Sequence, residues 1–104
     1  MENIPPLVIE FSGSATIRRA CEIAESLKQA LASSERVEVD CSGVTEVDIT
    51  FVQLLLAAHR EAKSSDKILS LSSAASGALL NVLTVLGIQN GPGKKFWFGG
   101  RDKR

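Results

Sequence analysis

An acid and a hydroxyl stand two residues apart in Asp48-Ile49-Thr50, directly before a long apolar run. A hydroxyl at the start of a helix lies at the surface, where free backbone N–H groups and the helix dipole stabilise a phosphate. Phosphorylation of Thr50 would add about −1.5 to −2 charges beside Asp48 and would repel a partner packed on this helix end. These residue types at this spacing indicate a phosphorylation switch, with Thr50 as the candidate acceptor.

Helix capping alone also explains these residues. Thr50 at the N-cap and Gln53 three residues later form a capping box, and Ile49 with Leu54 form a hydrophobic staple. A cap of this kind is worth about 1 kcal/mol, so the fold by itself would justify the threonine. The sequence leaves both explanations open.

The sequence offers few residues for catalysis, metal binding or phosphate binding. The chain has one histidine, His59, and no tyrosine, and no second histidine or cysteine stands at metal-ligand spacing. No nucleophile elbow is present. Gly93-Lys94 does not complete a phosphate-binding loop, because that motif needs a glycine at Ile88 and a hydroxyl at Lys95. We therefore expect no enzyme activity, no metal and no cofactor, and we expect His59 to lie on the flank of a helix.

The apolar pattern that must position these residues alternates between a period of two and a helical period. Ser72-Ser73 is expected to cap the last helix, Gly87 to end it, and 91–93 to form a turn. Such alternation predicts an α/β fold with a mainly parallel, four-stranded sheet and helices packed against it. In chain order, the expected elements are a strand at 7–11, a helix at 16–34, a strand at 36–41, a helix at 50–63, a strand at 67–71, a helix at 72–86 and a strand at 95–98.

Length and charge bound the organisation of the chain. Its 104 residues suffice for one domain, with an expected core over about 7–98. Residues 94–104 carry five bases and one acid, whereas the first 93 residues carry seven bases and eleven acids. An acidic body with a short basic end results, and 99–104 is expected to be a flexible, solvated tail. The tail lacks an interleaved aromatic platform, so we expect no nucleic-acid partner.

The start of the chain and its apolar runs bear on location. The first residues are acidic and Pro5-Pro6 follows at once, which is not the pattern of a signal peptide. No apolar stretch approaches the ~20 residues that span a bilayer. We expect a cytoplasmic protein without direct membrane insertion. Ile17 and Cys21 fall on the apolar face of the first expected helix, and Cys41 falls on the apolar face of the second expected strand. All three are predicted to be buried, the two cysteines as inert thiols.

The stretch Val37–Asp48 (VEVDCSGVTEVD) resembles the strand and loop of STAS domains, and Leu83–Ile88 (LTVLGI) resembles the closing helix of that family. The resemblance extends over residues 7–88. STAS domains are shared by bacterial anti-sigma-factor antagonists and by the cytoplasmic ends of sulfate transporters. The resemblance implies a STAS-like single domain that binds proteins and is not an enzyme.

The antagonist branch of the family implies a specific mechanism. There the domain binds an anti-sigma factor that is also a serine/threonine kinase, and it is released when its own hydroxyl is phosphorylated. Asp48 matches the family's aspartate and Thr50 matches the acceptor position. Two residues depart from the pattern: Ile49 replaces the first hydroxyl, and Phe51 stands where glycine is usual.

Three functions follow from the resemblance. The first is a bacterial signalling regulator that binds an anti-sigma factor, a serine/threonine kinase or a sensor-kinase-type protein, with Thr50 as the phosphorylation site. The second is a constitutive adaptor of a chemotaxis or sensor-kinase system, or an accessory subunit of a lipid-transporting ABC system. The third is a nucleotide-binding module. The residues expected to contact the partner are Asp48, Ile49, Thr50, Phe51 and Gln53.

Overall fold

One three-stranded sheet forms the centre of the computed structural model, which describes residues 5–88 and 94–98. Its strands are β1 (Leu7–Ala15), β2 (Arg36–Val47) and β3 (Ile68–Leu71), in the spatial order β1-β2-β3. Both neighbouring pairs are parallel, as the alternation of strands and helices predicts.

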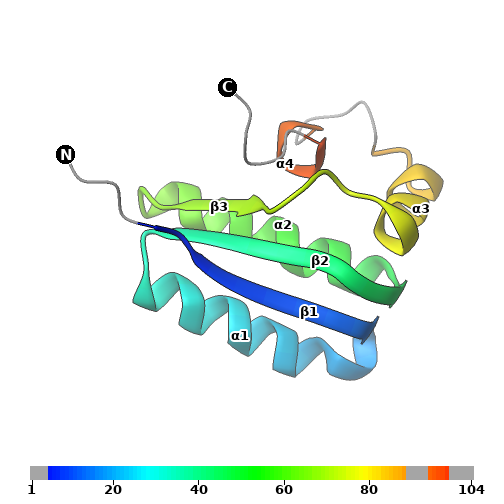
Figure 1. The fold of residues 1–104 in the computed structure, drawn as a ribbon, viewed down its shortest axis with the longest axis horizontal. Helices are drawn as coiled ribbons and strands as arrows, with labels where there is room; N and C mark the ends of the chain where they lie inside the picture. Colours follow the sequence, from blue (N-terminus) through cyan, green and yellow to red (C-terminus); the bar gives the residue numbers. More distant parts are fainter. Residues whose placement is uncertain (1–4, 89–93, 99–104) are drawn as a thin grey trace.

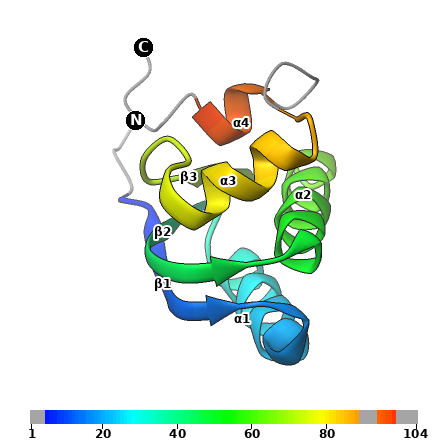
Figure 2. The same ribbon diagram turned by 90° about the vertical axis from the view of Figure 1, so that its right-hand side faces the viewer.

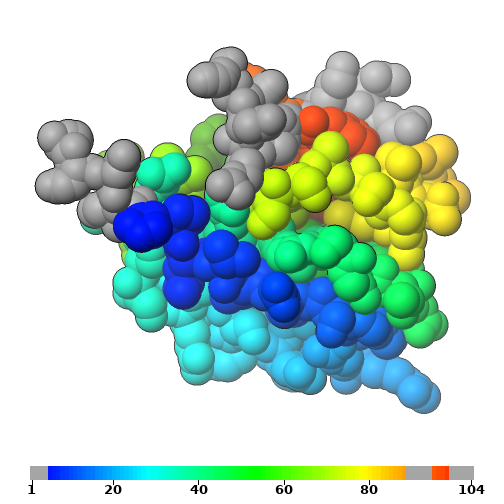
Figure 3. Space-filling view, viewed as in Figure 1, coloured from blue at the N-terminus to red at the C-terminus, as the bar shows by residue number. Residues whose placement is uncertain are grey.

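Helices connect the strands and cover the sheet on one side. Figure 2 shows α1 and α2 together on one face of the sheet, with α3 and α4 on the β3 side. Figure 1 shows the same strands from the side that α1 and α2 do not cover. In the space-filling view of Figure 3, β1 and much of β2 are visible at this surface. The helical elements are the 3₁₀ turn η1 (Ile17–Arg19), α1 (Ala20–Ser33), α2 (Ile49–Ser64), α3 (Gly77–Val85) and α4 (Lys94–Phe98).

The prediction of a fourth strand at 95–98 is wrong, because this segment is the helix α4. Phe96 and Trp97 are adjacent and are only 6% and 0% exposed. Successive side chains of a strand point to opposite faces, whereas one helical turn can bury two neighbours against the same core. A four-residue apolar run cannot distinguish these two cases by its periodicity. The turn expected at 91–93 and the tail expected at 99–104 lie outside the described residues.

β1 and β2 extend beyond their expected ends at residues 11 and 41 and continue through Gly13 and Gly43. β1 and β2 shift register between the pairs Glu10–Asp40 and Ser12–Gly43, which is an irregularity of the β-bulge kind. A Cβ on Gly43 would lie 3.0 Å from the Ser12 Cβ. The glycine therefore marks a close approach of two strands rather than a break.

The first helix begins later than its sequence pattern suggests. A 3₁₀ turn precedes it, and the core-facing residues of α1 are Ile23, Leu27, Ala30 and Leu31. Ile17 lies outside that helical phase and is 67% exposed, so its expected burial is wrong. Cys21 is also exposed, which corrects the second prediction on this face.

The two cysteines provide a direct test of this helix phase. Cys21 is exposed, whereas Cys41 is half-buried and burial, with the charge of Asp40, raises its thiol pKa to about 12. Because the thiolate is the reactive form, Cys41 should react far more slowly with a disulfide reagent at pH 8. We expect one fast thiol in the native protein and two in urea. Two fast thiols in the native protein, or a fast reaction retained in Cys21→Ser, would contradict this assignment.

The helix α3 starts and ends at residues with clear capping positions. Ser76, rather than Ser72-Ser73, occupies the N-cap position of α3. At the other end Gly87 has φ 72°, and its N–H donates to the Thr84 carbonyl while the Ile88 N–H donates to the Leu83 carbonyl. This pair of bonds is a Schellman motif, so the prediction that Gly87 ends the helix is confirmed.

The hydrophobic core fills the space between the sheet and the layer formed by α1 and α2, and it continues to α3 and α4, where Leu79, Leu83 and Trp97 are buried. Val37 and Val39 of β2 are 1% and 0% exposed, and Phe11 of β1 meets Phe51 of α2 edge to face with ring centroids 5.8 Å apart. Within the described residues, no helix has the length and apolar character that a bilayer crossing requires.

Candidate functional site

The start of α2 is fixed by Asp48, the single residue between β2 and α2. Its Oδ1 accepts hydrogen bonds from the backbone N–H groups of Thr50, at 3.0 Å, and Phe51, at 3.4 Å. Asp48 is therefore the N-cap, and the expected capping box of Thr50 and Gln53 is wrong. Aspartate caps helices at least as well as threonine, and at this position it starts the helix at Ile49.

The other carboxylate oxygen of Asp48 joins α2 to a distant part of the chain. Its Oδ2 accepts from the backbone N–H of Ile17 at 3.0 Å, across 31 residues of sequence. One side chain thus holds both the entry to η1 and the entry to α2 at the same edge of the sheet. Charge-assisted bonds of this kind are about twice as strong as neutral ones, so they fix the relative position of the two segments.

Arg19 reinforces the same loop from the other side. Its Nη1 donates to the backbone carbonyls of Ser12, at 3.0 Å, and Ser14, at 2.6 Å. The guanidinium also pairs with Glu22 at 3.2 Å, and these bonds from Arg19 lower the pKa of the Glu22 carboxyl. The segment between β1 and α1 is therefore fixed at two points, by Arg19 on the β1 carbonyls and by Asp48 on the Ile17 N–H.

The side chain of Thr50 takes no part in these contacts, although the Thr50 backbone N–H donates to Asp48. Thr50 is the second residue of α2, is half-buried, and its hydroxyl makes no hydrogen bond to another residue within 5–88 or 94–98. Gln53, one turn further on, is exposed. The hydroxyl therefore stands at a helix N-terminus without a structural role in the described part of the chain.

Two exposed, large apolar residues lie at this helix start. Ile49 is 48% exposed, and Ile17, held close by the bond to Asp48, is 67% exposed. We call Ile17, Ile49, Thr50 and Gln53 the α2-start surface. Ile17 was not predicted as part of a site, since its spacing suggested a buried helix face. Phe51, which was predicted to contact a partner, is 0% exposed and lies beneath this surface.

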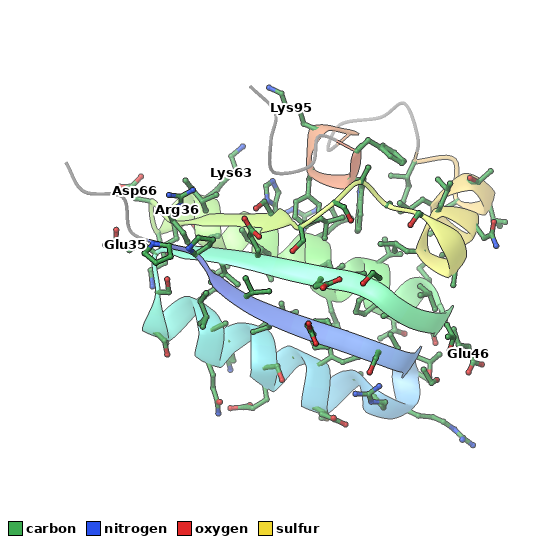
Figure 4. The ribbon with its side chains drawn as sticks, in the orientation of Figure 1. Glu35, Arg36, Glu46, Lys63, Asp66 and Lys95 are labelled. Atoms are coloured by element: carbon green, nitrogen blue, oxygen red, sulfur yellow. The ribbon has the colours of Figure 1, made fainter. Side chains whose placement is uncertain are left out.

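A cavity of about 350 Å³ lies between α1 and α2, and Leu54 on its wall is one turn beyond Thr50. Both helices cross between parallel strands, so both begin at the edge of the sheet that carries the α2-start surface. Glu46, labelled in Figure 4, lies at this edge close to the end of β2. Besides Leu54, the cavity is lined by Ala24, Glu25, Leu27, Lys28, Leu31, Ala32, Ala57, Ala58, Glu61, Ala62, Ser65 and Lys67.

Among the described residues, no group of three histidine, cysteine, aspartate or glutamate side chains is arranged to hold a metal ion. His59 lies on α2 at a different place, where it stacks on Phe96 of α4.

Comparison with known proteins agrees with this architecture. One solved structure, the sulfate transporter family protein from Wolinella succinogenes, superposes with a TM-score of 0.65 at 22% sequence identity. The match covers 98% of this chain and 84% of that one, and at this identity it shows a shared fold. No curated protein sequence gives a significant match. The protein-family model described as "Mlab, STAS domain" matches residues 5–94, which is most of the chain. The chain therefore belongs to the STAS-domain family.

Proposed function

We propose that this STAS domain is a signalling regulator that binds a protein partner through the α2-start surface and is switched by phosphorylation of Thr50. The observation that carries the proposal is the hydroxyl of Thr50. It stands at a helix N-terminus, and the helix is capped by Asp48 instead. With the cap supplied by another residue, stability no longer accounts for the threonine.

The geometry also suggests how a phosphate would act. The backbone N–H groups of Thr50 and Phe51 already donate to Asp48, so they are not free to receive a phosphate. A phosphorylated Thr50 would place about −1.5 to −2 charges beside that carboxylate, where like charges repel. The modification would therefore work by disturbing the surface and repelling the partner, not by filling an anion site.

The partner contact itself would be apolar. Ile17 and Ile49 are exposed large side chains at one edge of the fold, and clustered apolar exposure is typical of protein interaction sites. The cavity between α1 and α2 begins near this surface at Leu54 and runs toward the C-terminal ends of both helices, at Ala32 and Ser65. The partner classes that the family implies are an anti-sigma factor with serine/threonine kinase activity or a sensor-kinase-type protein.

The switch is tested by partner capture with wild-type, Thr50→Ala and Thr50→Glu baits, followed by measured affinities for the captured protein. We expect Thr50→Ala to bind as wild type does. Thr50→Glu should bind at least about tenfold more weakly, a loss of about 1.4 kcal/mol. Ser33→Glu is a matched control, because it adds the same charge at the exposed end of α1, away from the α2-start surface. Equal affinity of Thr50→Ala and Thr50→Glu would remove the switch.

The second candidate is a constitutive adaptor or transporter subunit, favoured by the isoleucine that stands beside Thr50 and by the transporter-family neighbour. In that case the wild-type, Thr50→Ala and Thr50→Glu baits capture the same partners. The variants Ile49→Asp and Ile17→Asp should no longer capture these partners. Retention of the partner by both aspartate variants would place the interface elsewhere on the domain. Saturable binding of ATP or GTP in a titration would instead favour the nucleotide-binding function.

A further inference from the structure

The short helix α4 is attached to the fold by two buried aromatic side chains and a backbone hydrogen bond. Phe96 and Trp97 are buried, and the Trp97 carbonyl accepts a hydrogen bond from the Ala75 N–H at 2.8 Å. Figure 2 shows α4 beside α3 on the β3 side of the molecule. β3 is an edge strand of the sheet, and α4 packs against it.

Three aromatic rings connect α4 to α2. His59 of α2 stacks on Phe96 with centroids 4.5 Å apart and an interplanar angle of 30°. Phe96 in turn meets Trp97 at 4.9 Å and 67°. The stack of His59 on Phe96 is therefore a direct side-chain contact between α2 and this helix.

The polar atoms of this ring cluster are poorly satisfied. His59 Nδ1 and Trp97 Nε1 are both buried, and neither has a hydrogen-bond partner among the described residues. A neutral imidazole tolerates an unused acceptor nitrogen at moderate cost. An imidazolium would instead bury a charged N–H donor without an acceptor, which costs considerably more.

We propose that His59 and Phe96 form a pH-sensitive latch, in which protonation of His59 releases α4 from β3. The latch is closed in the neutral imidazole form, which matches the observed stack. Release would expose Trp97, which is buried in the docked state. This inference is independent of the proposed role of Thr50.

The charged groups around His59 favour the closed state at neutral pH. Burial lowers the pKa of His59 from its ordinary value of 6.5, and Lys63 on α2 lowers it further, while a hydrogen bond with the Leu69 backbone of β3 acts in the opposite direction. From α4, Lys95 is exposed, and Figure 4 shows its side chain pointing away from the sheet. Because the docked state has the lower pKa, docking is stable above pH 6.5 and weakens as the pH falls below that value.

The composition of the chain makes the test direct. It contains one tryptophan and one histidine, so Trp97 reports on α4 and His59 is the side chain whose ordinary pKa lies between pH 5 and 8. The experiment follows Trp97 emission and its quenching by acrylamide from pH 8 to pH 5, with far-UV circular dichroism recorded in parallel. His59→Phe is the matched control, since it keeps a ring against Phe96 and cannot titrate.

We expect the wild-type emission to shift to the red and its quenching to rise below pH 6.5, with the helical signal largely retained. His59→Phe should keep the pH 8 spectrum throughout, and His59→Leu serves as a second non-titrating variant if the phenylalanine does not fit. A wild-type spectrum unchanged down to pH 5 would overturn the latch. So would an acid shift that persists in both variants, or one that accompanies loss of the whole helical signal.

Discussion

Replacing Asp48 by alanine is expected to lower the free energy of unfolding by about 2–3 kcal/mol. An N-cap aspartate contributes about 0.5–2 kcal/mol, and a hydrogen bond to a charged group contributes about 1.5–3 kcal/mol. Asp48 makes both kinds of contact, since Oδ1 caps α2 and Oδ2 holds the Ile17 N–H. Urea denaturation followed by circular dichroism measures the loss.

Two matched variants separate these contributions. Asp48→Asn keeps one oxygen and is itself a good N-cap, so it should retain the capping bonds and lose the bond to Ile17. We expect it to fall between wild type and Asp48→Ala. Thr50→Ala should change the stability by less than about 0.5 kcal/mol, as is usual for positions outside such contacts. A larger loss for Thr50→Ala than for Asp48→Ala would restore threonine as the cap.

The assignment of roles within Asp48-Ile49-Thr50 follows from these contacts. Both oxygens of Asp48 are used by backbone donors, so the carboxylate positions the surface from within. The side chains of Ile49 and Thr50 take no part in these bonds, and we propose that they contact the partner. Among these three adjacent residues, Asp48 fixes the junction of β2 and α2, whereas Ile49 and Thr50 form part of the α2-start surface.

Long periodic segments could be predicted from the sequence because their burial has a regular repeat. Alternating apolar residues, such as Val37 and Val39 of β2, predict the three parallel strands that are observed. Apolar stripes such as that of α2 predict the two helices that cover them. The predictions of secondary structure and burial fail in two places. Lys94–Phe98 is too short a segment to show a period, and at Ile17 a 3₁₀ turn precedes the helix.

The sequence identified Asp48 and Thr50 as a candidate site, but it did not predict which contacts these residues make. Asp48 and Thr50 both satisfy the chemical requirements of an N-cap, and only the path of the chain decides which one is used. The part played by Ile17 depends on a bond across 31 residues, which no local pattern encodes. Exposure of a residue near a helix start is therefore the least predictable property of this site.

Phe51→Ala is expected to cause the largest loss of stability, about 3–5 kcal/mol, because removal of a fully buried ring leaves a cavity. Phe51 is 0% exposed and packs edge to face against Phe11, with centroids 5.8 Å apart. Such a loss approaches the whole stability of many small domains, so Phe51→Leu provides the milder comparison. Both variants are measured by urea denaturation.

The same pair decides what the phenylalanine does at a position where the family usually has glycine. If Phe51 supports the α2-start surface from below, Phe51→Leu should bind the partner with nearly unchanged affinity once it is folded. A binding defect in Phe51→Leu with wild-type stability would instead mean that the ring is reached by the partner. Burial favours the first outcome, because a side chain without exposed area can influence a partner only through the residues that cover it.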